Sequence, residues 1–142
     1  MTEEEVMEAW VKDAPIDETD LSGSARAIPI LHTKYYPIYK KEKLKLAAMR
    51  LKLTKLKHAK EDFMNNPTEE DFARGWEYPD RKILKGDIRQ YLEGDDDILK
   101  LQLRIAAQAE FVDMLQDILR QIGNRNFIIT NMIKDRDFLH GG

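Results

Sequence analysis

The sequence predicts an all-α protein with a single helical domain, and three observations support this fold class. Apolar residues recur at helical spacings of three and four, most clearly in residues 38–66 and 98–122. Neither stretch contains a proline, so both can form long helices. Alternating runs rich in Val and Ile, separated by hairpin turns, would predict strands, and the chain has none. A length of 142 residues is typical of one domain.

The N-terminal segment, residues 1–37, is expected to hold one acidic helix followed by irregular chain. Thr2 and Glu5 have the spacing of a capping box, which predicts a short helix that ends near Lys12. Three prolines and a glycine interrupt the rest of the segment, up to Pro37, and they predict turns and short pieces there.

The second segment, residues 38–66, is expected to be one basic helix of about 25 residues, roughly 38 Å long. Its apolar residues at spacings of three, four and three form a stripe that predicts a seam for another helix. The stripe consists of Leu46, Met49, Leu53 and Leu56. A smaller apolar line, Leu44 and Leu51, lies on the opposite side, so the helix has two faces to bury.

Two further segments complete the chain. Residues 67–97 are expected to form acidic connecting helices and loops, including a helix over residues 80–93 that Asp80 caps. Asp95, Asp96 and Asp97 resemble a cation site, but acids at a helix N-terminus more commonly cap the helix, so capping is the preferred interpretation. Residues 98–142 are expected to hold an apolar helix that ends at Gly123, followed by a last helical or extended piece.

The composition argues against several classes of function. The chain has no cysteine, so it offers no disulfide framework and no thiolate for a nucleophile or a metal site. No apolar run approaches the roughly 18 residues of a membrane span, and the first residues are acidic where a signal peptide would be basic. We therefore expect a soluble intracellular protein. His32, His58 and His140 are scattered, and no glycine-rich phosphate loop is present, so we expect no enzyme, no metal and no cofactor.

Charge is strongly segregated along this chain of net charge −3. Residues 34–60 contain ten bases and a single acid, Glu42, a net charge of +9. Residues 1–20 contain eight acids and one Lys, and residues 61–97 contain twelve acids and five bases, so each sums to −7. Blocks of opposite sign usually have a partner, within the molecule or outside it.

Three interpretations of the basic helix follow from its composition. Nucleic-acid binding is favoured, because a solvated surface helix normally mixes Glu with Lys to avoid repulsion between like charges four residues apart. Neutralisation by the acidic blocks or by a protein partner is the second interpretation. Binding to a membrane surface is the weakest, since the helix lacks Trp and its apolar face is narrow.

The order of these features resembles a known family. An acidic amphipathic N-terminus is followed by "IDETDL", "TKYY" and "KKE", and then by "DDDILKL" and the C-terminal "GNRNFIITNMIKDRDF". This order is similar to that of the UvsY family of recombination mediators from T-even-like bacteriophages. The resemblance covers nearly the whole chain at similar length. None of the motifs is a catalytic signature, so the resemblance depends on their order and extent.

The resemblance implies a non-enzymatic accessory protein of phage recombination, repair and recombination-dependent replication, in the cytoplasm of the infected bacterial host. Members of the family bind single-stranded DNA, weaken the hold of the phage single-strand-binding protein and help to load a RecA-like recombinase, UvsX. They assemble as ring-like homo-oligomers, hexameric or heptameric, through the C-terminal region.

The resemblance and the helical spacing together predict the site residues. The family's DNA-binding motif corresponds to residues 57–63, where the basic pair is Lys57 and Lys60, spaced by three instead of two. The residues expected to bind DNA are Lys41, Lys43, Arg50, Lys55, Lys57, His58 and Lys60. The residues expected at the oligomer interface are Leu115, Leu119, Ile122, Phe127, Ile129, Met132, Ile133 and Phe138.

Two functions from other classes remain open. A helical adaptor whose basic helix binds an acidic protein would show no DNA affinity that depends on oligonucleotide length. A regulator that binds double-stranded DNA or RNA would normally carry a groove-reading helix or an aromatic motif.

Overall fold

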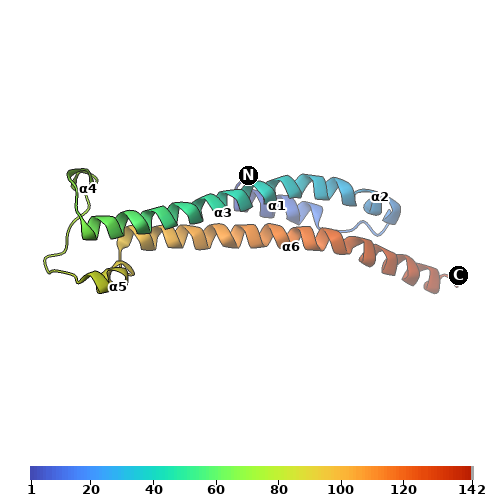
Figure 1. Ribbon diagram of the computed structural model, residues 1–142. Coiled ribbons are helices and arrows are strands. Elements are labelled where there is room, and N and C mark those ends of the chain that lie inside the picture. Colours follow the sequence, from blue (N-terminus) through green and yellow to red (C-terminus); the bar gives the residue numbers. More distant parts are fainter. Residues whose placement is uncertain (142) are drawn as a thin grey trace. The chain divides into compact units, whose positions relative to one another are not determined.

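The computed structural model describes residues 1–141, and every regular element in that range is a helix. The fold class predicted from the sequence is therefore confirmed. Figure 1 labels the elements in chain order. They are α1 (Glu3–Asp13), α2 (Leu21–Arg26), α3 (Ile28–Asn65), α4 (Glu69–Ala73), the 3-10 helix η1 (Lys85–Asp87), α5 (Ile88–Leu92) and α6 (Asp96–Leu139).

Contacts gather the chain into two compact units. The first unit contains residues 1–44 together with the chain from Ala109 onward, and the second contains residues 45–108. The helices α3 and α6 each contribute to both units. The division of the chain into the four segments expected above remains a prediction.

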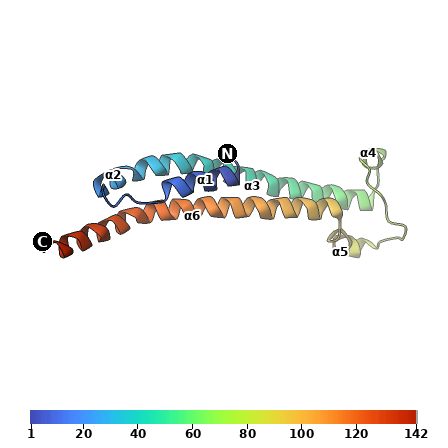
Figure 2. The ribbon, with the colours of Figure 1, turned by 180° about the vertical axis from the view of Figure 1, so that it is seen from behind.

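The first unit is built around α1, which lies beside α3 and α6 in both views (Figures 1 and 2). Val6 and Trp10, four residues apart on one face of α1, are buried, and the Trp10 ring meets Tyr35 edge-on at 5.6 Å between centroids. The buried core of this unit consists of Val6, Trp10, Leu31, Tyr35, Phe111, Leu115, Ile118 and Ile122.

The second unit has its own core, which gathers around Phe63 near the end of α3. The rings of Phe72, Trp76 and Tyr78 approach Phe63 with centroids 5.6, 5.6 and 6.0 Å away. The buried members are Phe63, Met64, Ile83, Ile88, Leu92 and Ile98. The aromatic residues that follow the basic helix therefore pack on one another and stabilise this core.

The N-terminal caps predicted at Thr2 and at the acids after Gly94 are confirmed. Thr2 and Glu5 form the capping box of α1, and Thr68 and Asp71 form that of α4. Asp95 caps α6, because its Oδ2 accepts a hydrogen bond from the Ile98 N–H at 3.1 Å. These outcomes depend on residues three apart, which is why the sequence reveals them.

The expected start of the basic helix is wrong, because α3 begins at Ile28 and Pro37 lies inside it. Pro37 lacks the N–H that would bond to the carbonyl of Thr33, so it weakens the helix there. Leu31 and Tyr35 are buried in the first core, and their packing offsets that loss. Pro29 lies in the first turn, where its missing N–H has no partner to lose.

The expected end of the apolar helix at Gly123 is also wrong, since α6 continues to Leu139. Ile122, Arg125 and Ile129 are buried on one face across this point. Arg125 Nη1 donates to the carbonyl of Ala14 at 2.8 Å, which ties this part of α6 to the chain after α1. Burial of that face outweighs the roughly 1 kcal/mol that a glycine costs within a helix.

The expected helix over residues 80–93 is shorter than predicted. Leu84 has an extended backbone, with φ −67° and ψ 146°, and only η1 and α5 follow it. Ile83 is buried in the second core, and the extended chain brings it there. Asp80 therefore does not cap a helix, since no helix begins beside it.

Candidate nucleic-acid interface

The helix α3 carries the bases that the sequence singles out, and its packing decides which of them face solvent. The seam predicted from spacing is confirmed: Leu46 is buried, and Met49, Leu53 and Leu56 are half-buried. Because the seam faces inward, most bases on the other sides of the helix are left in solvent.

Eight bases of α3 are exposed along about 26 Å of helix, from residue 40 to residue 57. They are Lys40, Lys41, Lys43, Lys45, Arg50, Lys52, Lys55 and Lys57. His58 is exposed next to them. Of the residues expected to bind DNA, all except Lys60 therefore lie at the surface.

None of these eight bases has a carboxylate within 4.0 Å in the part of the chain that the structure describes. The Nζ atoms of Lys40 and Lys43 each lie 5.6 Å from an aromatic centroid, of Tyr36 and Tyr39 respectively. A ring face attracts a cation without cancelling its charge. The exposed surface of α3 therefore keeps its positive charge.

Lys34, the first base of the block, is paired differently. Its Nζ lies 2.5 Å from Asp13 Oδ2, which also accepts a hydrogen bond from the Tyr35 hydroxyl at 2.7 Å. Burial acts to raise the pKa of Asp13, but these two hydrogen bonds and the charges of Lys34 and Arg125 outweigh it, so the pKa is lowered. Burial and the Asp13 carboxylate together raise the pKa of Tyr35. Lys34 thus holds α1 to α3.

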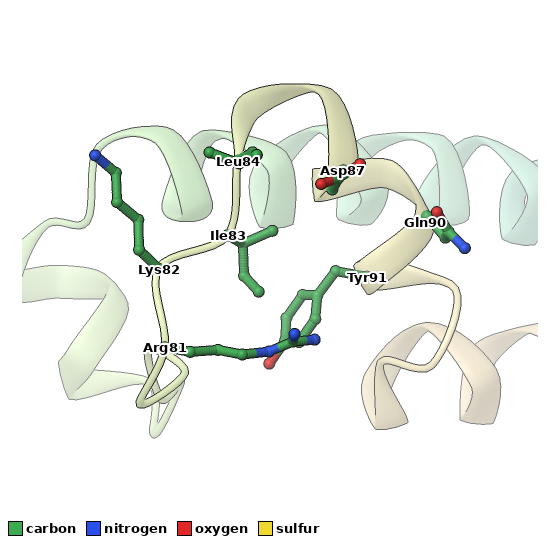
Figure 3. Close-up of a pocket in the computed structure, with 7 residues that line it drawn as sticks. All are labelled: Arg81, Lys82, Ile83, Leu84, Asp87, Gln90 and Tyr91. Atoms are coloured by element: carbon green, nitrogen blue, oxygen red, sulfur yellow. The ribbon is translucent and has the colours of Figure 1, made fainter.

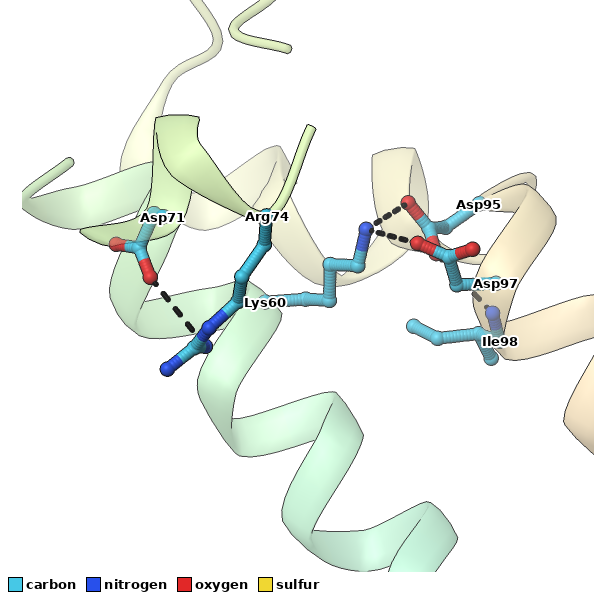
Figure 4. A network of polar contacts seen from close by, with 6 residues as sticks. All are labelled: Lys60, Asp71, Arg74, Asp95, Asp97 and Ile98. Atoms are coloured by element: carbon cyan, nitrogen blue, oxygen red, sulfur yellow. Dashed lines mark hydrogen bonds and ion pairs between the residues drawn. The ribbon is translucent and has the colours of Figure 1, made fainter. Parts of the chain in front are cut away.

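The sequence predicts that Lys60 lies outside the packed core. The structure contradicts this, because Lys60 is only 6% exposed. Its Nζ lies 3.2 Å from Asp95 Oδ1 and 2.8 Å from Asp97 Oδ2 at the start of α6 (Figure 4). The same Nζ stands 4.3 Å from the centroid of Trp76. The hydrogen bond from Lys60 lowers the pKa of Asp97. The charge of Lys60 is neutralised inside the second unit.

The acids after Gly94 explain this placement. Asp95 caps α6 with one carboxylate oxygen and pairs with Lys60 through the other. Arg74 approaches the Trp76 ring at 5.1 Å and pairs with Asp71 at 3.5 Å (Figure 4). Burial of an amine is costly unless charged partners and hydrogen bonds compensate it, and Asp95 and Asp97 supply both to Lys60.

One base near the exposed surface could not be found from the sequence. Arg89 on α5 pairs with Glu61 of α3 at 3.3 Å, and its side chain is 86% exposed. Arg89 and Lys57 line the same groove, of about 330 Å³. Only the folding of α5 against α3 brings them together, since they are 32 positions apart in the sequence.

Comparisons with known proteins agree with this geometry. A family model described as "Recombination, repair and ssDNA binding protein UvsY" matches residues 9–142. The chain belongs to the UvsY family. No curated protein matches the sequence. A crystal structure of the bacteriophage T4 recombination mediator protein UvsY has a similar fold, with a TM-score of 0.80 and 22% identity over 97% of this chain and 99% of that chain.

In this UvsY-family chain the residues expected at an oligomer interface divide into two groups. Leu115, Ile122 and Ile129 are at most 2% exposed, and Leu119 packs beside them, so these four fill the interior of a single chain. Whether they also contribute to an oligomer interface remains a prediction. Met132 is half-buried, whereas Phe127, Ile133 and Phe138 are 70%, 43% and 82% exposed. Of the eight expected residues, Phe127, Ile133 and Phe138 are therefore the most accessible to another molecule.

A hollow of the second unit lies beside α5. Figure 3 shows Arg81, Lys82 and Asp87 around it, with the Arg81 side chain directed toward Tyr91. Its volume is about 550 Å³. Among residues 1–141, no three His, Cys, Asp or Glu side chains gather as metal ligands, and no helix is long and apolar enough to cross a bilayer.

Proposed function

We propose that this UvsY-family chain is a recombination mediator that binds single-stranded DNA along the exposed bases of α3. One observation supports this most directly: eight bases on α3 face solvent without a carboxylate beside them. The acidic blocks of the chain leave them free. The two bases at the ends of the block, Lys34 and Lys60, are the ones that pair with acids.

A row of cations suits a single strand because the phosphate backbone dominates the affinity and carries no sequence information. Lys43, Arg50 and Lys57 repeat every seven residues, and Lys45 and Lys52 repeat in the same way on the other flank of the seam. Two parallel rows let a flexible strand follow the helix without a fixed base register. Binding should therefore tolerate different sequences.

The mediator role extends this binding to two protein partners. We propose that the chain weakens the hold of the phage single-strand-binding protein on DNA and helps to load a RecA-like recombinase. These steps would occur in the cytoplasm of the infected bacterial host. Moderate affinity for the strand suits such a role, because a loading factor must release the DNA that it presents.

Assembly would turn one basic helix into a longer track. We propose a ring-like homo-oligomer, a hexamer or heptamer, held by the exposed apolar side chains of the C-terminal part of α6. These side chains are Phe127, Ile128, Ile133, Phe138 and Leu139. Repeated weak contacts then act together through a high effective concentration.

Fluorescence anisotropy with labelled oligo-dT at several salt concentrations tests the DNA proposal. If about five phosphates are neutralised per protomer, log K should fall with log salt at a slope of roughly −3.5. The variant K43A/R50A/K57A should reduce that slope by about 2, since each lost phosphate contact removes about 0.7.

The matched control is R81A/K82A/K85A, which removes three exposed bases of the second unit that lie outside α3. It should change the slope far less than the α3 variant does. Equal effects of the two variants, or a flat response of the wild type to salt, would count against the proposal.

A helical adaptor that binds an acidic protein is the second candidate function. Leu44 and Leu51, 73% and 65% exposed, favour it because they lie among the bases and suit a helix better than a phosphate backbone. In that case the affinity for oligo-dT would not increase with oligonucleotide length.

A further inference from the structure

The outer face of α1 combines acids with exposed apolar side chains. Val6 and Trp10, on the inner face of α1, are buried in the core of the first unit. On a helix of 3.6 residues per turn, Met7 and Val11 lie about 100° around the axis from Val6 and Trp10, and they are 45% and 65% exposed. Glu4 and Glu8 form a second exposed line next to them. The outer face thus has an apolar ridge bordered by carboxylates.

The stability of a single chain explains only part of this outer face, because Glu4 in the first turn of α1 opposes the helix dipole but the other three residues gain nothing from it. Glu4 and Glu8 are four residues apart, a spacing at which like charges on a helix repel each other. Within residues 1–141 no base lies within 4.0 Å of either carboxylate. Met7 and Val11 add apolar surface whose exposure to water is unfavourable. Both features suit contact with another molecule.

The outer line of α3 has the complementary pattern. Leu44 and Leu51 lie seven residues apart on one line of the helix, opposite the buried seam, with the small residues Ala47 and Ala48 between them. Exposed bases border this line on both sides. They are Lys41 and Lys52 on one side and Lys43 and Arg50 on the other.

The dimensions of the two faces agree. Leu44 and Leu51 are separated by about 10.5 Å along α3, and Met7 and Val11 by about 6 Å along α1. A ridge of about 6 Å fits between the two leucines, over the alanines, which allow close approach. In that position the carboxylates of α1 lie beside bases of α3.

We propose that the acidic outer face of α1 docks onto the basic outer line of α3 in a second copy of the chain, in competition with single-stranded DNA. The second copy is required because the inner face of α1 is packed on Leu31 and Tyr35 of its own chain. Both complementary surfaces belong to this one sequence, so no other protein is needed. The competition, though not the docking, depends on the proposed DNA binding.

The docked contact covers the same bases that a strand would use. Each copy whose α3 is occupied by α1 has lost part of its DNA surface. A strand must displace α1 to bind, and α1 can in turn help to displace the strand. Docking of α1 therefore lowers the affinity for DNA and helps the assembly to release a bound strand.

Disulfide trapping tests the docking directly, because the chain contains no cysteine. A tagged M7C chain is mixed with an untagged L51C chain and oxidised mildly. The control replaces L51C with L84C, since Leu84 is also 65% exposed. A disulfide needs Cα atoms roughly 4.4–6.8 Å apart, so only a docked pair should react quickly.

The mixed M7C–L51C product should exceed the M7C–L84C product at least about tenfold, because docking raises the effective thiol concentration. High salt and added oligo-dT should both reduce it. Equal yields of the two mixed products would overturn the docking. A yield that oligo-dT leaves unchanged would overturn the competition.

A second arm measures DNA affinity. The variant E4Q/E8Q is compared with E69Q/E70Q, which removes the same charge from exposed acids of α4. If α1 covers about two thirds of the α3 faces, E4Q/E8Q should bind oligo-dT about threefold more tightly than the control. Equal affinities would overturn the competition.

The two proposals fail in different ways. If M7C and L51C react preferentially but the wild type has no affinity for oligo-dT, the DNA proposal fails and the docking stands. If the wild type binds oligo-dT and the two mixed products form equally, the DNA proposal stands and the docking fails.

Discussion

Replacing Lys60 with Met separates a structural lysine from a DNA-binding one. Methionine keeps much of the length and apolar character of the side chain but removes its charge. The substitution leaves Asp95 and Asp97 without the amine that lies 3.2 and 2.8 Å from them. It also removes the cation that stands 4.3 Å from the Trp76 ring.

The size of the effect follows from how much water can reach the remaining charges. Removing one partner of a fully buried ion pair costs about 3–5 kcal/mol. Here the side chains of Asp95 and Asp97 are 19% and 51% exposed, so water can solvate them once the amine is gone. We therefore expect a loss of about 2 kcal/mol, below the buried range. At about 3 °C per kcal/mol, the melting temperature should fall by about 6 °C.

In contrast to stability, the DNA affinity of K60M should change little. At temperatures well below the melting transition, K60M should bind oligo-dT with nearly wild-type affinity, because Lys60 is 6% exposed and already neutralised. The matched variant K57M removes an exposed lysine three residues earlier. It should reduce the salt slope by about 0.7 and change the stability by less than about 0.5 kcal/mol.

Circular dichroism during heating and fluorescence anisotropy with labelled oligo-dT measure the two properties on the same samples. A K60M variant with unchanged melting temperature and DNA affinity as weak as that of K57M would refute the reasoning. Lys60 would then have to leave the acids of α6 and contact the strand directly.

Two further predictions concern the length and the end of the long helices. P37A should stabilise the protein by up to about 3 kcal/mol, because an alanine N–H can restore the missing helical hydrogen bond. The measurement is the melting temperature, which should rise. An unchanged melting temperature would mean that the Thr33 carbonyl already has a hydrogen-bond donor. F127Q/F138Q should lower the oligomer mass in light scattering while helicity is kept, since both rings are 70% or more exposed. The same double substitution at Leu99 and Leu103, which are also exposed but lie on the earlier part of α6, is its control; equal losses of mass would contradict a C-terminal interface.

The sequence by itself determined the features that depend on near neighbours. The capping boxes of α1 and α4 need residues only three apart, and the seam of Leu46, Met49, Leu53 and Leu56 needs only the helical period. The exposure of Lys41, Lys43, Arg50, Lys55 and Lys57 follows from the same period, because residues off the seam face water. Local geometry is sufficient for each of these.

Tertiary structure decided the features that depend on partners far along the chain. Lys60 meets Asp95 and Asp97, more than thirty residues later, and Arg125 meets the carbonyl of Ala14, 111 residues earlier. The same long-range packing carries α3 through Pro37 and α6 through Gly123 against local preference. A local pattern cannot reveal such outcomes, because the energy that decides them comes from burial against segments whose position only the fold defines.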